Sequence, residues 1–287
     1  MEDHKSIIIA VFSTASGIGK TITAINLAAG FAKEGYEVCL ADLDIQFGDV
    51  MSYLGLESEV TLADAQLALA EDPVNFRVED FLAEYRKDGI SFSVLPPPKE
   101  INDAYLVDVE AVEVIVQRLS HFNFIVLDLT AVFNALNLAM LDMSTVINYI
   151  GVMDFLPAVK NYKVGYDTLL RFDYEASKIC LVENRSDSEK FIKSRDVERL
   201  LGEKFYHRLP NDYPAVSKSI REGQPLMLAA PLSPLTQSYW QLVGRYTNRH
   251  MSPKNPMQGK TLSSTALSWL LSIGRSKSAE TAAQGVS

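Results

Sequence analysis

The sequence predicts an α/β protein, built on a mostly parallel β-sheet with helices on both of its faces. Short apolar runs rich in β-branched residues alternate along the chain with segments whose apolar residues recur at helical spacing. The first apolar run also leads through a glycine-rich stretch straight into the first helical segment. Because a helix that follows a strand returns the chain to the same end of the sheet, this alternation makes neighbouring strands parallel.

The individual elements follow from this pattern. Residues 6–13 (SIIIAVFS) form the first expected strand, and residues 20–34 form a helix that stops at Gly35. Further helices are expected over 108–119 and about 189–201, and less regular helical segments over about 48–86. The remaining strands are expected at 36–44, 90–95, 122–129, 144–152, 177–183 and about 205–209.

Composition divides the chain into one domain and a tail. Residues 1–248 read as a single globular domain, 249–261 as a Pro- and Gly-containing linker, and 262–287 as a tail. The whole chain has a net charge of −9, but the part from Arg249 onward holds five basic residues and one acid, a balance of +4. The body before Arg249 therefore carries −13, which argues against specific DNA binding because that needs clustered basic residues.

The positions of the cysteines and histidines and the lengths of the apolar runs narrow the classes of protein to which this chain can belong. Cys39 and Cys180 lie inside apolar runs, which predicts buried thiols rather than a disulfide. The four histidines are scattered without metal-ligand spacing. No apolar run reaches the about 18 residues that a membrane span requires. We therefore expect a cytoplasmic protein.

The stretch FSTASGIGKTITA (12–24) predicts a phosphate-binding loop, which we call the phosphate loop (residues 14–21). Gly17 and Gly19 allow the backbone to turn its N–H groups inward at the start of a helix. Lys20 can then reach the terminal phosphates, and the Thr21 hydroxyl can bind Mg²⁺. Thr14 replaces the first glycine of the strict G-x-x-x-x-G-K-[ST] pattern. The alternative is an ordinary turn in which Lys20 begins a solvated helix.

Carboxylates follow two of the expected strands. Asp42 and Asp44 end the second strand and Asp128 ends the apolar run FIVLD (124–128), so all three should lie beside the phosphate loop. Asp44 can orient a water for attack on a γ-phosphate or hold Mg²⁺, and Asp128 is a candidate metal anchor. We expect Asp42 to brace the turn. The alternative for Asp128 is a helix cap.

These motifs together resemble the MinD/ParA superfamily of P-loop ATPases, whose members have a deviant Walker A loop and a SIMIBI-type fold. The diagnostic loop of that superfamily, Lys-Gly-Gly-x-Gly-Lys-Thr, aligns on residues 15–21. DLDIQFGDVMSYLGL (42–56) and LPNDYPAVSKSIREGQPL (209–226) further resemble the CpaE/TadZ branch, whose ATPases are associated with Flp/Tad-type pilus assembly. The resemblance extends over about residues 6–247.

The resemblance implies ATP and Mg²⁺ as cofactors and a role for each matching residue. Lys20 and Asp44 are the implied catalytic residues, and the implied metal ligands are Thr21, Asp44 and Asp128. Asn184 matches the adenine-contacting asparagine, although plain turn chemistry is the alternative for Asn184 and Asn211. The implied nucleotide-binding set is Ser16, Gly17, Ile18, Gly19, Lys20, Thr21, Ile22, Asn184, Pro210, Asn211 and Asp212.

Two departures from the family pattern bear on activity. The first loop lysine of the family reaches across an ATP-sandwiched homodimer, and Ala15 stands at its position. Ile22 replaces the hydroxyl residue that commonly follows the metal-binding threonine. Binding relies mainly on backbone N–H groups, Lys20 and Mg²⁺, so it should survive, whereas hydrolysis should be slow. Lys33 or a residue of a partner protein could substitute for the missing lysine.

The tail segment LSSTALSWLLSIGR (262–275) predicts an amphipathic helix. Leu262, Ala266, Trp269, Leu270 and Ile273 fall on one side at helical spacing, and basic residues flank the segment. This suits peripheral contact with the inner face of a membrane, or a polar position in the cell. The alternatives are docking on the chain's own domain and binding of a partner protein.

The favoured function is an ATP-dependent dimerising switch that acts in the localisation or assembly of a Flp/Tad-type pilus or secretion machine, with pilus or secretion proteins as partners. One alternative is a ParA-like partition ATPase or a MinD-like ATPase that positions cell division. Another is a scaffold of pseudo-ATPase type that recruits partners without nucleotide.

Overall fold

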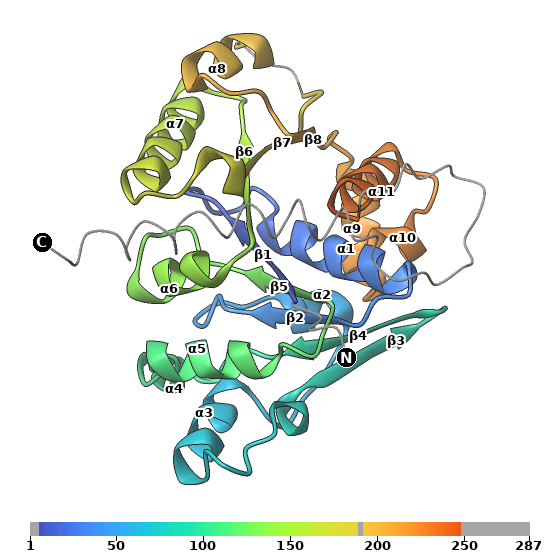
Figure 1. The fold of residues 1–287 in the computed structure, drawn as a ribbon. Coiled ribbons are helices and arrows are strands. Elements are labelled where there is room, and N and C mark those ends of the chain that lie inside the picture. Colours follow the sequence, from blue (N-terminus) through green and yellow to red (C-terminus); the bar gives the residue numbers. More distant parts are fainter. Residues whose placement is uncertain (1–5, 189–191, 248–287) are drawn as a thin grey trace, which may run out of the picture.

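A computed structural model of the chain describes residues 6–188 and 192–247. The linker expected at 249–261 and the tail expected at 262–287 lie outside the described residues. The described chain forms one eight-stranded sheet in the order β3-β4-β2-β5-β1-β6-β7-β8 (Figure 1).

Seven of the eight strands run parallel. The central strand β1 (Ile7–Phe12) lies between β5 (Phe124–Asp128) and β6 (Val146–Val152), and β2 (Val38–Asp42) pairs with the far side of β5. The sheet continues on one side through β4 (Ile90–Leu95) and on the other through β7 (Ile179–Asn184) to the short β8 (His207–Arg208). The carboxyl ends of these strands therefore meet at one edge, where the loops of interest emerge.

Helices cover both faces of the sheet and enclose two apolar cores. The core on one face is filled from α1 (Lys20–Lys33), α2 (Val50–Leu54), α9 (Tyr213–Glu222), α10 (Leu226–Ala229) and α11 (Pro234–Tyr246). The core on the other face takes residues from α3 (Leu62–Glu71), α5 (Val109–Arg118), α6 (Ala135–Met143), α7 (Leu156–Arg171) and α8 (Ser194–Leu201). Short helices complete the connections: α4 (Ile101–Tyr105), η1 (Val78–Phe81) and η2 (Ala176–Lys178). This confirms the predicted fold class.

One expected segment is corrected. The sequence pattern predicts helical segments across about 48–86, but the end of this stretch forms β3 (Ala83–Lys87), which pairs antiparallel with β4. Asp88 (φ 47°) and Gly89 (φ 74°) turn the chain with left-handed backbone angles, as a two-residue Asp-Gly hairpin requires. Tyr85 is the buried residue of β3 and its ring stacks on Phe92 of β4 at 5.1 Å between centroids. The Asp-Gly turn therefore determines the structure of residues 83–87 as a hairpin strand, in place of the helix that the irregular apolar pattern predicted.

Three other sequence expectations concern the two cysteines, membrane-spanning segments and the number of helices. Cys39 and Cys180 are buried free thiols, as predicted, and burial raises the pKa of Cys180 to about 12. Within the described residues, no helix is long and apolar enough to span a membrane. Helices α6, α7, α9, α10 and α11 lie in stretches for which the sequence predicted no element.

Candidate nucleotide-binding site

The phosphate loop connects β1 to α1 at the carboxyl edge of the sheet. Gly17 and Gly19 have φ of 68° and 94°, the left-handed region that glycine adopts without strain. Gly19 is the N-cap of α1, and no side chain caps the helix there. The first-turn N–H groups therefore remain available to an anion, and the helix dipole favours negative charge at this end.

The end of β7 braces the phosphate loop. Asn184 donates its Nδ2 to the carbonyl of Ile18 at 2.7 Å, and Arg185 donates Nη2 to the carbonyl of Gly17 at 3.0 Å. A Cβ on Gly19 would lie 2.7 Å from Asn184 Nδ2, so the loop and the asparagine are in close contact. Arg185 has a left-handed φ of 52°. Sequence reasoning missed Arg185, although its position directly after Asn184 was a visible signal.

Asp128 lies beneath the phosphate loop and beside the first residues of α1. Its side chain is buried, and among the described residues neither carboxylate oxygen forms a hydrogen bond of ordinary geometry. Burial raises the pKa of Asp128 to about 7, while the Thr21 hydroxyl and the Lys20 charge act in the opposite direction. The predicted residues Lys20, Thr21 and Asp128 are thus brought together by β5 and α1.

Asp42 and Asp44 occupy different positions at the end of β2. Asp42 is fully buried opposite Asp128 in the strand register, and it accepts hydrogen bonds from the N–H groups of Asp44 (3.2 Å) and Val50 (3.1 Å). Burial, and then the charge of Asp128, raise the pKa of Asp42. Asp42 therefore braces the turn, in agreement with the sequence analysis. Asp44 is half-buried, and its Oδ1 accepts from Phe47 N at 3.4 Å.

These side chains fit a divalent cation of the Mg²⁺ type. Asp128 offers two buried oxygens without hydrogen-bond partners among the described residues, a costly arrangement that a bound cation would relieve. The Thr21 hydroxyl lowers the pKa of Asp128 and the charge of Asp44 raises it, so both residues belong to the surroundings of this carboxylate. An all-oxygen set is the donor type that Mg²⁺ takes.

The predicted nucleotide-binding residues away from the loop are partly committed to the fold. Asp212 caps α9 through Ala215 N (3.1 Å) and accepts from Ser233 Oγ (2.6 Å). Asn211 donates its backbone N–H to Asp187 Oδ1 at 2.5 Å, next to the half-buried Pro210. These contacts place 210–212 at the end of β8, and their role at a base stays a prediction.

Three of the described residues in or next to the phosphate loop, Ala15, Ser16 and Ile22, form no side-chain contact with the candidate metal and phosphate groups. The side chain of Ile22 is buried in the core on the α1 face, so its N–H is the only group that it can offer to a ligand. Ser16 is exposed at the tip of the loop. Ala15, at the position of the family lysine, is half-buried and packs against the same core.

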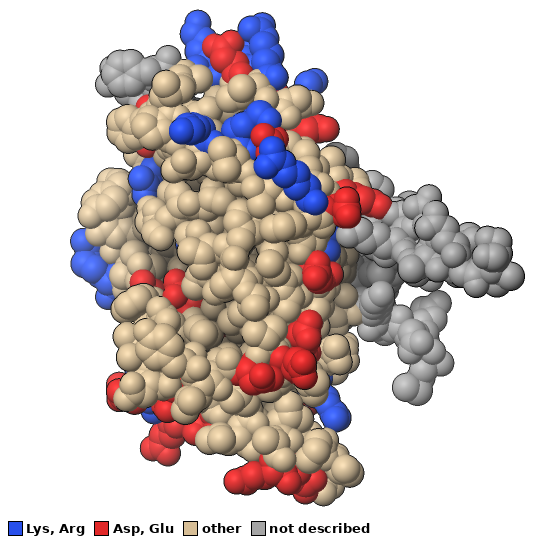
Figure 2. Space-filling view, turned by 90° about the vertical axis from the view of Figure 1, so that its left-hand side faces the viewer, with Lys and Arg blue, Asp and Glu red and all other residues tan. Residues whose placement is uncertain are grey.

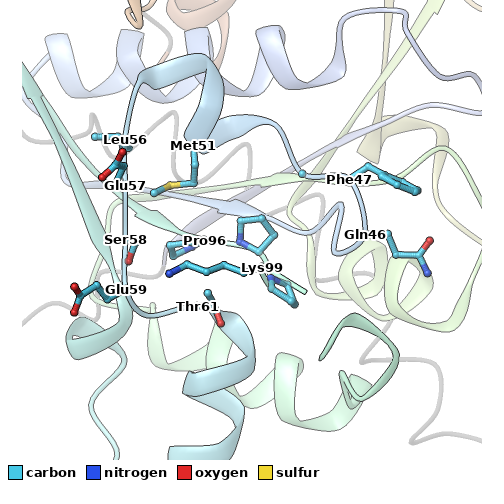
Figure 3. A pocket seen from close by; sticks show the side chains of 13 residues that line it. Gln46, Phe47, Met51, Leu56, Glu57, Ser58, Glu59, Thr61, Pro96 and Lys99 are labelled. Carbon is cyan, nitrogen blue, oxygen red and sulfur yellow. The ribbon is translucent and has the colours of Figure 1, made fainter. Parts of the chain in front are cut away.

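A cavity of about 560 Å³ lies beside the turn that carries Asp44 (Figure 3). Met51, Leu56 and Pro96 contribute apolar walls, and Lys99 extends across the cavity toward the side of Ser58 (Figure 3). None of the predicted site residues lines it. The cavity therefore adjoins the site through the loop after β2 without being part of the phosphate loop.

Surface charge is segregated on the face that Figure 2 shows, with basic side chains gathered at the end formed by α7 and α8. Two of these basic residues are paired on their own helices: Lys163 with Asp167 at 2.6 Å and Arg199 with Asp196 at 3.1 Å. Such pairing reduces the charge available to a polyanion.

Comparisons with known proteins agree with this geometry. The CobQ/CobB/MinD/ParA nucleotide-binding domain matches residues 9–226. The septum site-determining protein MinD of Thermotoga maritima is 30% identical over 122 residues, which are 42% of this chain and 43% of that protein. The chain thus matches less than half the length of this relative.

Two solved structures share the fold. A ParA family ATPase from Chlorobium tepidum superposes with a TM-score of 0.73 at 21% identity, over 83% of this chain and 98% of that one. MinD from Pyrococcus horikoshii, solved with Mg-ADP, gives 0.70 at 19% identity, over 83% and 94%. The domain match covers most of the chain, including the phosphate loop and the three strand-end carboxylates. The chain therefore belongs to the CobQ/CobB/MinD/ParA nucleotide-binding domain family.

Proposed function

We propose that this chain is an ATP-binding switch that dimerises around the nucleotide, hydrolyses it slowly, and acts in the localisation or assembly of a Flp/Tad-type pilus or secretion machine. The observation that carries the binding step is the phosphate loop itself. Its two left-handed glycines, uncapped helix start and braces from Asn184 and Arg185 form an anion site that is already shaped. A shaped loop binds phosphate without a further ordering cost.

Each residue of the site has a distinct task in this proposal. The loop N–H groups and Lys20 bind the phosphates, and Thr21 and Asp128, with Asp44, hold Mg²⁺. When bound, Mg²⁺ neutralises charge on the phosphate oxygens. Asp44 orients the attacking water from the turn after β2, where it is half-buried and close to Asp128.

Slow hydrolysis follows from Ala15. The methyl group of Ala15 packs on the core and supplies no charge to a nucleotide in a neighbouring copy. In other phosphoryl-transfer systems a cation supplied in trans contributes about 10³–10⁵ in rate. Its absence leaves the binding groups intact while removing charge stabilisation in the transition state.

The test compares ATP binding with turnover. We expect calorimetry with ATP and Mg²⁺ to show binding by the wild type and by Ala15→Lys. Turnover should rise at least about tenfold in Ala15→Lys, because the added cation restores part of the trans contribution. Lys20→Ala is the control, and it should lose binding. Rapid wild-type hydrolysis that Ala15→Lys leaves unchanged would contradict the proposal.

The assignment to a pilus or secretion machine rests on the resemblance of the stretches 42–56 and 209–226 to the CpaE/TadZ branch. The two stretches also meet in the fold, since a Cβ built on Gly223 would lie 3.3 Å from the Cα of Gly55. Deletion of the gene should reduce surface pili, and the Lys20→Ala variant should fail to restore them. Normal pili in the deletion strain would overturn this assignment.

Partition and cell-division positioning remain the second candidate, favoured by the likeness to MinD and ParA proteins. A salt titration of DNA binding separates partition from the first candidate, because phosphate contacts give a steep salt dependence. A scaffold that works without nucleotide would show no heat with ATP and Mg²⁺.

Peripheral membrane contact through 262–275, which lies outside the described residues, stays part of the proposal. A blue shift of Trp269 fluorescence on anionic vesicles, lost on truncation at Gly259, would support this contact. An unchanged spectrum would contradict it.

A further inference from the structure

Thr14 stands where the strict phosphate-loop pattern has its first glycine, and its side chain makes contacts that glycine cannot make. The Thr14 hydroxyl lies 3.0 Å from the Tyr149 hydroxyl and donates to the carbonyl of Asn161 at 3.2 Å. Tyr149 belongs to β6 and Asn161 to α7. One loop side chain therefore contacts both the sheet and the helix that follows β6.

Tyr149 is itself tied to α7. Its ring is fully buried and stacks on Tyr162 of α7 with 4.5 Å between ring centroids. Its hydroxyl donates to the Tyr162 carbonyl at 3.1 Å, and the Tyr162 hydroxyl donates back to the Tyr149 carbonyl at 2.9 Å. The stacked pair thus has one hydroxyl that faces the phosphate loop and one that does not.

Gly165 gives the two hydroxyls the space they occupy. A Cβ on Gly165 would meet the Tyr149 hydroxyl oxygen, and it would lie 2.5 Å from Thr14 Cγ2. Glycine destabilises the interior of a helix relative to alanine, so its presence in α7 indicates a close approach. The space beside Gly165 is filled by the Tyr149 hydroxyl and the Thr14 side chain together, and a glycine at position 14 would leave Thr14's share of it empty.

The hydrogen-bond inventory allows two arrangements of these groups that include a bond between the two hydroxyls. Each hydroxyl has one hydrogen to donate, and three short contacts compete for the two hydrogens. Either Thr14 donates to Tyr149, which donates to the Tyr162 carbonyl, or Tyr149 donates to Thr14, which donates to the Asn161 carbonyl. Both arrangements hold the phosphate loop to α7, but each uses a different carbonyl of the helix.

We propose that Thr14 is a positioning residue that fixes the shape of the phosphate loop through Tyr149 and couples that shape to α7. When a nucleotide binds, the loop N–H groups move toward its phosphates, and this movement shifts the Thr14 hydroxyl. Because Thr14 contacts α7 both directly and through Tyr149, the shift reaches α7. The inference rests on the proposed nucleotide binding and specifies how the loop communicates with the rest of the domain.

The first experiment measures Mg-ADP affinity of the full chain by calorimetry. Thr14→Val keeps the shape and removes the hydroxyl, and it should weaken binding about fivefold, the loss expected for one hydrogen bond. Tyr149→Phe should weaken binding similarly, and the double variant should weaken it by less than the two single losses combined, because both substitutions remove the contact between the two hydroxyls. Thr14→Ser keeps the hydroxyl and should bind within about twofold of the wild type.

Tyr162→Phe is the matched control. It removes a hydrogen bond of the same kind from the same stacked pair without touching Thr14, so it should lower thermal stability as Tyr149→Phe does and leave Mg-ADP affinity unchanged. Equal weakening by Tyr162→Phe and Tyr149→Phe would show that the packing of the pair matters rather than the Thr14 contact, and would overturn the inference.

The second experiment follows hydrogen exchange in α7. Mg-ADP should slow exchange of α7 amides in the wild type and in Thr14→Ser, and have no such effect in Thr14→Val. If Thr14→Val binds Mg-ADP with wild-type affinity, or if Mg-ADP slows its α7 exchange as much as in the wild type, the inference would be overturned while nucleotide binding stays intact. A wild type that binds no Mg-ADP would instead overturn the proposed function, and this inference with it.

Discussion

The phosphate loop and the β2 corner, by which we mean residues 44–59, lie at the same edge of the sheet but are held in different ways. The loop receives contacts from three distant segments: Asn184 and Arg185 at the end of β7, Tyr149 on β6, and Asn161 on α7. The hydrogen bonds of the β2 corner are local, including those that Asp42 accepts from the N–H groups of Asp44 and Val50, while its helix α2 packs on the core and against α9. It also adjoins the cavity of Figure 3.

This difference in how the two regions are held assigns nucleotide binding to one region and nucleotide hydrolysis to the other. Phosphate binding needs several N–H groups in fixed directions, and a loop braced from several sides supplies them. Asp44 lies in the part of the β2 corner that precedes α2, where Phe47 is 71% exposed. We infer that nucleotide binding depends on the braced loop and that the water-orienting acid depends on how the β2 corner is held. A switch with tight binding and slow turnover fits this division.

The largest expected effect comes from adding one methyl group to Gly19 of the phosphate loop, and Gly55 of the β2 corner provides the matched comparison. Gly19→Ala should destabilise the protein by more than about 2 kcal/mol and abolish measurable Mg-ADP binding, because φ is 94° and the new Cβ would lie 2.7 Å from Asn184 Nδ2. Gly55→Ala has a φ of 61°, but its Cβ would meet only Gly223 Cα at 3.6 Å.

Gly55→Ala should therefore cost only about 1 kcal/mol, the left-handed penalty alone, and leave Mg-ADP affinity unchanged. Urea unfolding and calorimetry measure both quantities. A loss of nucleotide binding in Gly55→Ala equal to that in Gly19→Ala would show that the two regions act as one unit, against the comparison drawn above.

An intermediate effect is expected from the pH dependence of stability. Asp128 has a native pKa of about 7, and an unfolded aspartate titrates near ~4. Between these values the unfolded chain releases a proton that the native protein keeps, so the free energy of unfolding falls as pH rises. The contribution is at most about 1.4 kcal/mol per pH unit.

Asp128→Asn should remove this contribution and flatten the stability profile between about pH 5 and 7, since the amide does not titrate. Burial still raises the pKa of Asp42 in Asp128→Asn, although the contribution from the charge of Asp128 is lost, so some slope should remain. Asp196→Asn, an exposed residue paired with Arg199, serves as the control. Parallel profiles for the wild type and Asp128→Asn would show that Asp128 is ionised in the nucleotide-free protein.

The smallest effect is expected at the outer brace of the loop. Arg185→Ala removes the hydrogen bond to the Gly17 carbonyl and should weaken Mg-ADP binding by about fivefold, because the inner brace from Asn184 remains. Arg199→Ala, which removes an exposed ion pair on α8, should change affinity by less than about twofold. Equal affinities for both variants would mean that Arg185 does not shape the loop.

Local sequence signals predicted a large part of the fold and of the site. The strand–glycine–helix order fixed where the phosphate loop lies, and strand ends placed Asp42, Asp44 and Asp128 beside it. The strand β3 was missed because its residues AEYRK carry little apolar alternation, and the Asp88-Gly89 hairpin turn was the usable signal. Arg185 was missed because its partner, Gly17, lies 168 residues away.

By itself the sequence determined the features that depend on neighbouring residues: the alternation of strands and helices, the left-handed glycines, the start of α1 at Lys20 and the absence of a lysine at position 15. Only the tertiary structure decided which groups face one another: Thr14 with Tyr149, Asn184 with Ile18, and Asp42 with Asp128. The physical reason is the distance along the chain over which each interaction acts. Backbone angles and periodicity are set within a few residues, whereas burial, raised carboxylate pKa values and loop braces arise when distant strands place their ends together.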